Sequence, residues 1–151
     1  MGAQQTVASD DAELDAVLRP DFDGRRTLVT RDPLPGLAAT PVAAPAGRAT
    51  IVRYDPERVV VDATARRPSA LVLTDLHYPG WKATVDGRPA DLRRVDWLLR
   101  ATPLPAGRHR VELRYEPASW RAGWIVSLIA LVGLAATLAI GLRARRRAAA
   151  G

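Results

Sequence analysis

The hydrophobic and polar positions follow two different patterns along the chain. Between residues 25 and 117, apolar residues mostly alternate with polar ones, which is typical of strands with one buried face. In one such segment Trp81, Ala83 and Val85 share a face, and Lys82 and Thr84 share the other. The alternation predicts strands over 26–30, 48–54, 58–65, 70–76, 81–85, 90–95, 97–101 and 108–115.

Turn signals separate the predicted strands. Asp86-Gly87 lies between two alternating segments and predicts a type I′ hairpin turn, in which both central residues have positive φ. Four prolines mark residues 32–47 as an irregular connector. Short antiparallel strands with frequent turns predict a mainly β fold, an antiparallel β-sandwich of immunoglobulin-like or jelly-roll-like type.

A short helix is predicted over residues 10–19, before the strands. Asp10 is suited to cap it, and Glu13 follows three residues later in a capping-box pattern. Leu14 and Val17 are spaced to share one apolar face, and Pro20 ends the segment.

The last part of the chain carries a long uncharged run. Residues 122–142 number 21, and a helix of that length extends roughly 30 Å, the thickness of a bilayer core. A buried core helix is the alternative, but such helices usually carry a polar stripe and run shorter. The run therefore predicts a transmembrane helix over 118–142, with membrane-interface residues Trp120, Arg121, Trp124, Arg143, Arg145, Arg146 and Arg147.

The basic tail predicts an orientation in a bacterial cell membrane. The excess of arginine over 143–151 favours a cytoplasmic C-terminus. The predicted parts are a helical segment at 1–24, an extracytoplasmic β-sandwich at 25–117, the membrane helix and the tail. Residues 1–20 lack the features of a signal peptide. We therefore expect a piece of a longer polytopic protein, although a misassigned start or a split gene would look the same.

Composition adds little about partners. The net charge is +6, but residues 1–121 hold 18 basic against 16 acidic side chains, so most of the excess lies in the tail. Because the remaining arginines are scattered, we expect no nucleic-acid partner. The chain has no cysteine, which excludes disulfides, a thiol nucleophile and cysteine-ligated zinc. One lysine against 21 arginines is typical of a GC-rich bacterial genome.

Three segments carry a resemblance to a known family. They are YDPERV from Tyr54, LVLTDLHYPGWKATVDGRP from Leu71 and LPAGRHRVELRYEP from Leu104, followed by the terminal helix. In this order they resemble the C-terminal region of the YfhO family of bacterial membrane proteins. The resemblance covers roughly residues 50–142.

The resemblance implies a context for the chain. Members of this family are similar to membrane glycosyltransferases that use lipid-linked sugars, and their C-terminal region looks like an extracytoplasmic β-sandwich before a last membrane helix. The implied partners are the lipid bilayer, the transmembrane helices of a larger polytopic protein, and a cell-envelope glycan or lipid-linked sugar. The helices of the catalytic core have no counterpart in this sequence, so no catalytic residue is assigned.

The loop after the fourth predicted strand is the candidate ligand-contacting segment. Tyr78 and Trp81 could stack on a sugar ring, although Trp81 is more simply a core residue and Pro79-Gly80 a bend. Asp75 and His77, together with Asp86 near the turn residue Gly87, could form a metal or acid–base set. The favoured alternative is that Asp75 and His77 end a strand. We therefore expect no metal site and no cofactor.

The remaining polar and aromatic residues have structural interpretations. Trp97 and Leu99 are expected in the core, and Asp96 or Arg100, on the opposite face, is expected to be exposed. His109 is expected to be a hydrogen-bonded histidine or one at the rim of the core. The leading hypothesis is a non-catalytic accessory domain of a membrane glycosyltransferase. A stand-alone membrane-anchored glycan-binding module is the alternative, and a hydrolase or metalloenzyme is the third.

Overall fold

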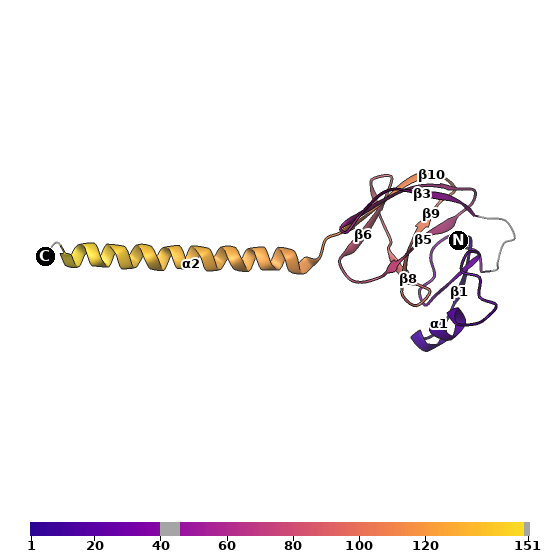
Figure 1. The fold of residues 1–151 in the computed structure, drawn as a ribbon, viewed down its shortest axis with the longest axis horizontal. Coiled ribbons are helices and arrows are strands. Elements are labelled where there is room, and N and C mark those ends of the chain that lie inside the picture. Colours follow the sequence, from indigo (N-terminus) through magenta and orange to yellow (C-terminus); the bar gives the residue numbers. More distant parts are fainter. Residues whose placement is uncertain (40–45, 150–151) are drawn as a thin grey trace. The chain divides into compact units, whose positions relative to one another are not determined.

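The chain forms two compact units, Met1–Glu116 and Pro117–Gly151. The computed structural model describes the backbone of residues 1–39 and 46–149, and in the final helix it describes the side chains of 119–120 and 123–137. The described strands lie in the first unit (Figure 1). The second unit consists mainly of α2 (Ala118–Ala149).

Two antiparallel sheets make up most of the first unit. The larger has the strand order β3 (Gly47–Asp55), β4 (Arg58–Ala65), β10 (Gly107–Tyr115), β6 (Trp81–Val85) and β7 (Arg88–Ala90). The smaller has the order β5 (Ser69–Leu76), β9 (Leu99–Leu104) and β8 (Arg93–Val95). A third element is the parallel pair of β1 (Ala3–Thr6) and β2 (Thr27–Thr30). The predicted mainly β, antiparallel fold is confirmed, and the two sheets are consistent with a β-sandwich.

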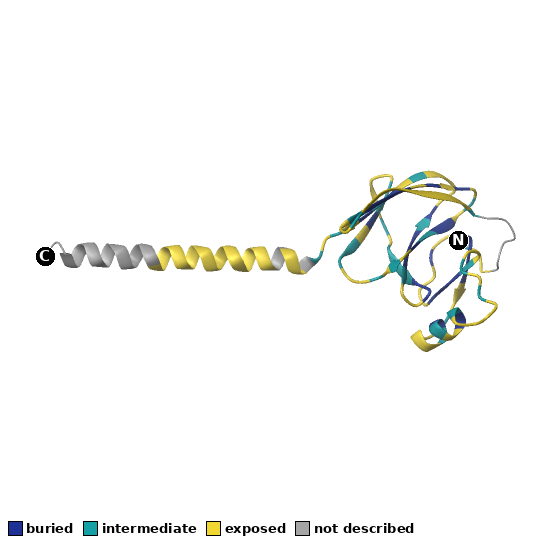
Figure 2. Ribbon diagram, viewed as in Figure 1, coloured by how far each residue is buried: buried dark blue, intermediate teal, exposed yellow. Residues whose placement is uncertain are grey.

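The small sheet buries both of its faces. One face packs on the large sheet, where Leu73 and Leu104 meet β4 and β10. The other face packs on β2 and the segment after it, where Ala70, Val95 and Ala101 meet Leu28 and Leu34. Figure 2 shows the buried residues concentrated in these strands. The small sheet is therefore the middle layer, and both of its sides contribute to stability through apolar burial.

Most predicted strands are present within one to three residues of their expected bounds. The segments 58–65 and 81–85 match β4 and β6 at both ends. The predicted strand 90–95 is wrong as one element, because the chain leaves the large sheet after β7 and enters the small sheet at β8. The strand β1 was not predicted, because its four residues show no clear alternation.

The first helix, α1 (Asp10–Val17), begins as expected but has a different cap. Ser9 is the N-cap residue, and its hydroxyl accepts a hydrogen bond from the Ala12 N–H at 3.2 Å. Asp10 is not the cap. Its carboxylate instead forms ion pairs with Arg31 and Arg94, which fix α1 to the ends of β2 and β8.

The helix α2 requires a correction to the predicted membrane span. Among the residues that the structure describes, no helix combines the length and the apolar character needed to cross a lipid bilayer. The transmembrane helix expected over 118–142 is therefore not borne out. The side chains of 138–142, and those of the tail arginines, lie outside the described residues.

Candidate functional site

The loop that joins β5 to β6 carries the predicted ligand-contacting residues. It crosses from the small sheet to the large one, and Gly80 makes the bend with a φ of 108°. Asp75 lies near the end of β5, and Trp81 begins β6. Tyr78 projects from the bend and is 43% exposed. The four predicted residues therefore belong to one short segment, but they contact different neighbours.

Asp75 pairs with a buried cation. The Arg100 guanidinium donates to the Asp75 carboxylate at 2.7 Å and lies 3.9 Å from the centre of the Trp81 ring. Arg100 is only 3% exposed, so the expectation of an exposed Arg100 is wrong. The Tyr54 hydroxyl also donates to Asp75, at 2.9 Å, and this hydrogen bond raises the pKa of Tyr54. Asp75 thus compensates a charge buried between the sheets.

Three aromatic rings form a cluster beside this ion pair. Tyr78 packs edge-on against Trp81 and Tyr115, with ring centres 6.2 and 5.4 Å apart. Trp81 also contacts Tyr115 and packs on the core, as the structural interpretation of Trp81 predicted. Edge-to-face pairs of this kind fix ring orientations. Tyr78 is therefore held in a defined position while nearly half of it faces solvent.

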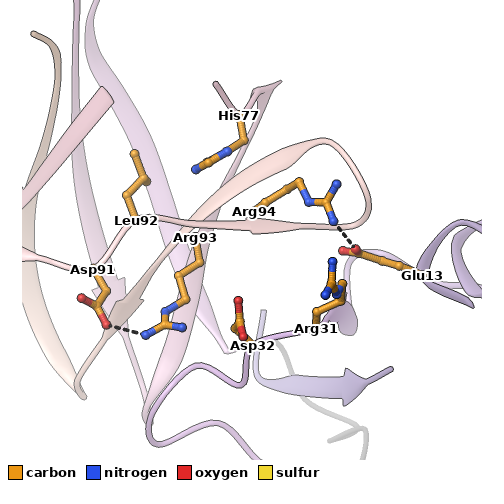
Figure 3. Close-up of a pocket in the computed structure, with 8 residues that line it drawn as sticks. All are labelled: Glu13, Arg31, Asp32, His77, Asp91, Leu92, Arg93 and Arg94. Atoms are coloured by element: carbon orange, nitrogen blue, oxygen red, sulfur yellow. Dashed lines mark hydrogen bonds and ion pairs between the residues drawn. The ribbon is translucent and has the colours of Figure 1, made fainter. Parts of the chain in front are cut away.

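His77, in the same loop, lines a separate cavity. This polar pocket encloses about 550 Å³ and is shown in Figure 3. Burial lowers the pKa of His77, and the charges of Arg94 and Arg100 lower it further. The remaining lining residues come from α1, the end of β2 and the segment that enters β8: Glu13, Arg31, Asp32, Asp91, Leu92, Arg93 and Arg94.

Glu13 is the residue that organises one wall of the polar pocket. It is fully buried, and its carboxylate accepts from Arg94 at 3.1 Å and from the Trp97 N–H at 3.0 Å. The sequence suggested Glu13 only as part of a capping box. No local signal marks its contacts, because Trp97 is 84 positions away in the chain.

Trp97 lies in a turn rather than in the core. Asp96 and Trp97 have φ values of 50° and 69°, a conformation that is unusual for an aromatic residue. The predicted core position of Trp97 is wrong, since its side chain is 39% exposed, whereas Leu99 does pack on the core. Asp96, expected to be exposed, is buried and accepts from the Val29 N–H at 2.7 Å.

The Asp86-Gly87 turn has the predicted conformation. Their φ values are 52° and 76°, as a type I′ turn requires. The Asp86 carboxylate accepts from the Arg110 N–H at 2.8 Å and lies 2.7 Å from His109 Nδ1, and the His109 contact lowers the pKa of Asp86. Asp86 is thus joined to His109 and not to Asp75 or His77. Within the described residues no group of three or more acidic, histidine or cysteine side chains is arranged to hold a metal ion.

The predicted membrane-interface residues are described only in part. Trp120 and Trp124 lie on α2 with most of their surface exposed, as do Ile125, Ile129 and Leu134. Figure 2 shows the described part of α2 in the colour of exposed residues. The side chains of Arg121, Arg143, Arg145, Arg146 and Arg147 lie outside the described residues.

Comparison with known proteins identifies one family. Residues 45–127 match the family model described as bacterial membrane protein YfhO. The match covers more than half of the chain, from the residues just before β3 into the first part of α2. No curated protein and no solved structure matches the chain.

Proposed function

Because the chain belongs to the family of the bacterial membrane protein YfhO, we propose that it is a non-catalytic, membrane-anchored β-domain. Its role is that of a C-terminal accessory domain in a membrane glycosyltransferase that uses lipid-linked sugars for cell-envelope glycans. The β-domain lies on the extracytoplasmic side, and the loop that carries Tyr78 contacts the glycan or the lipid-linked sugar. The family match, which includes this loop, is the observation that carries the proposal.

The surface of α2 supports the membrane attachment. Its described apolar side chains are exposed in succession, including Trp124, Ile125, Leu128, Ile129 and Val132. A contiguous apolar surface of this kind in water marks a contact with lipid or with other apolar helices. The apolar side chains of α2 therefore bind the bilayer or the helices of the membrane core.

Membrane attachment gives the first prediction. The full chain is expected to float with vesicles of phosphatidylethanolamine and phosphatidylglycerol in a density gradient. The double substitution Ile125→Asp and Ile129→Asp should move most of the chain to the bottom fraction, because charges at both positions oppose burial in lipid. The matched control places two aspartates on an exposed strand, by Arg48→Asp and Arg53→Asp, and should still float. Sedimentation of the unmodified chain without the vesicles would contradict attachment.

The accessory role is tested in the bacterium that makes the protein. Deleting the gene is expected to change the sugar composition of cell-envelope glycans, measured by hydrolysis and mass spectrometry. Tyr78→Ala should reproduce at least half of that change while leaving the amount of protein in the membrane fraction unaltered. Lys82→Ala, an exposed substitution on the neighbouring strand, is the control and should have no effect.

Each failure has a distinct meaning. An unchanged envelope after gene deletion would contradict the accessory role. An altered envelope that Tyr78→Ala does not reproduce would reject contact through this loop and leave the accessory role in place. The alternative of a stand-alone glycan-binding module predicts an unchanged envelope together with retention of the chain on isolated envelope glycan. The exposed surface of Tyr78, which a glycan could contact, is the observation that favours this alternative.

A further inference from the structure

The polar pocket has a charge pattern that selects the kind of ligand it can hold. Its lining contains three guanidinium groups and three carboxylates. Across Figure 3 the two kinds alternate, from Asp91 and Arg93 through Asp32 and Arg31 to Glu13 and Arg94. A phosphate would meet three carboxylates, and a cation would meet three arginines. The pocket therefore favours a neutral ligand that can both donate and accept hydrogen bonds.

The charged groups are held in place before any ligand binds. Arg93 pairs with Asp91 at 3.1 Å, Arg94 with Glu13 at 3.1 Å, and Arg31 with Asp10 at 3.0 Å. These ion pairs orient the guanidinium groups while leaving other N–H groups on the same side chains available. Arg93 and Arg31 remain more than a third exposed, so a ligand can reach them. Groups fixed in this way lose little entropy on binding.

Trp97, whose side chain is 39% exposed, is attached through its backbone to a residue of the pocket wall. The Trp97 N–H donates to the carboxylate of Glu13, which lines the pocket, so the Trp97 backbone adjoins the pocket wall. Its positive φ is costly for a tryptophan, and such strain persists only where surrounding contacts enforce it, commonly at functional sites. The hydrogen bonds from the Trp97 N–H to Glu13 and from the Val29 N–H to the Asp96 side chain enforce it here.

These features together match one ligand class. We propose that the polar pocket binds a neutral saccharide unit, whose hydroxyl groups accept from Arg93 and Arg94 and donate to Asp32 and Asp91. The apolar face of the sugar ring packs on the Trp97 indole. The volume of about 550 Å³ falls in the usual range of small-molecule sites. This inference rests on the proposed function and deepens it, because it names a second glycan contact and its chemistry.

The two histidines of the chain provide a direct test. His77 lines the polar pocket, while His109 is bound to Asp86 at the turn between β6 and β7. The full chain in detergent micelles is titrated with methyl glycosides of neutral hexoses and N-acetylhexosamines, and the imidazole C–H resonances are followed by NMR. At least one glycoside should shift the His77 resonances in a saturable manner and leave those of His109 unchanged.

Variants and a second probe sharpen the result. Arg93→Gln should weaken the binding at least tenfold, because it removes a charged hydrogen-bond donor. Lys82→Gln, which removes a surface ion pair on the opposite sheet, should not weaken it. Inorganic phosphate is the competing probe. Saturable shifts of His77 with phosphate and none with any glycoside would overturn the proposal, and so would equal shifts of both histidines.

Further comparisons identify the source of the saccharide and distinguish failure of the pocket proposal from failure of the proposed function. If the same sugar binds more tightly when it is carried on a polyprenyl phosphate, the pocket is assigned to the lipid-linked donor. If it binds equally well, the pocket is assigned to a glycan. Both outcomes support a saccharide site. If no sugar shifts the His77 resonances and the deletion strain has an altered envelope glycan composition, saccharide binding in the polar pocket is rejected and the proposed function is retained. If a sugar shifts the His77 resonances and the deletion strain has an unchanged envelope glycan composition, the proposed function is rejected and saccharide binding in the pocket is retained.

Discussion

Asp75→Ala is expected to lower the free energy of unfolding of the β-domain by about 3 kcal/mol. This is the lower end of the cost of leaving one member of a buried ion pair without its partner. Arg100 is almost fully buried, and its Nε and Nη1 atoms have no hydrogen-bond partner among the described residues. Asp75 supplies the opposite charge at 2.7 Å. Without it, a positive charge remains between the sheets against the Trp81 ring.

The measurement is urea unfolding of the full chain in detergent, followed by near-ultraviolet circular dichroism. That signal reports on the packed Trp81, Tyr78 and Tyr115 rings. Asp75→Asn retains a hydrogen-bond acceptor without the charge, and should cost roughly half as much as the alanine variant. Thr74→Ala, an exposed neighbour on the same strand, is the matched control and should change stability by less than about 0.5 kcal/mol.

A double-mutant cycle separates pairing from packing. Arg100→Met keeps an unbranched apolar side chain over Trp81 and removes the buried charge. The double variant Asp75→Ala with Arg100→Met should therefore be more stable than Asp75→Ala alone. If the two single effects simply add, Asp75 does not act by compensating Arg100, and this interpretation of the contact is wrong.

The strands were predictable where apolar residues recur on the core face of the large sheet. Val59, Val61 and Ala63 on β4 and Ala83 on β6 belong to the buried core, and the predicted bounds of both strands match the structure. The pattern fails where the chain changes sheet. Residues 90–95 were predicted as one strand, yet β7 pairs with β6 while β8 pairs with β9.

The site was less predictable, because its contacts join distant segments. The loop at 75–81 stood out by its aromatic residues, and the structure does place Asp75, Tyr78 and Trp81 in one connected network. The polar pocket could not be derived, since α1, β2, His77 and the start of β8 converge only in the folded domain. A charged residue such as Arg100 is expected at the surface, and its contacts with Asp75 and the Trp81 ring compensate its burial.

The turn at Asp96 and Trp97 was also not predictable from local sequence. Asp96 alone is a common turn residue, and Trp97 does not favour positive φ as glycine does, so the sequence does not mark a turn there. Tertiary hydrogen bonds from Trp97 to Glu13 and from Val29 to Asp96 impose the conformation instead. The strain in this turn is thus stabilised by residues that lie at least 67 positions away in the chain.

Asp96 gives the last prediction, through its buried carboxyl group. Burial raises the pKa of Asp96 from 3.8 to about 6, and the nearby Glu13 carboxylate adds to the rise, while the bond from Val29 and the N-terminal amine oppose it. The folded state therefore binds this proton more tightly than the unfolded chain does. The resulting stabilisation is fully present below pH 3.8 and is lost as the pH rises through about 6. The difference corresponds to about 3 kcal/mol.

Asp96→Asn should remove this loss and stabilise the domain at neutral pH. The amide oxygen can still accept from the Val29 N–H, and asparagine tolerates the positive φ better than most residues. We expect the variant to gain about 2 kcal/mol in unfolding free energy at pH 7.5 relative to the unmodified chain, and almost nothing at pH 4. Asp11→Asn, an exposed change on α1, should differ from the unmodified chain by less than about 0.5 kcal/mol at both pH values. A gain of equal size at pH 4 and pH 7.5 would show that the asparagine acts through turn conformation rather than through the buried charge.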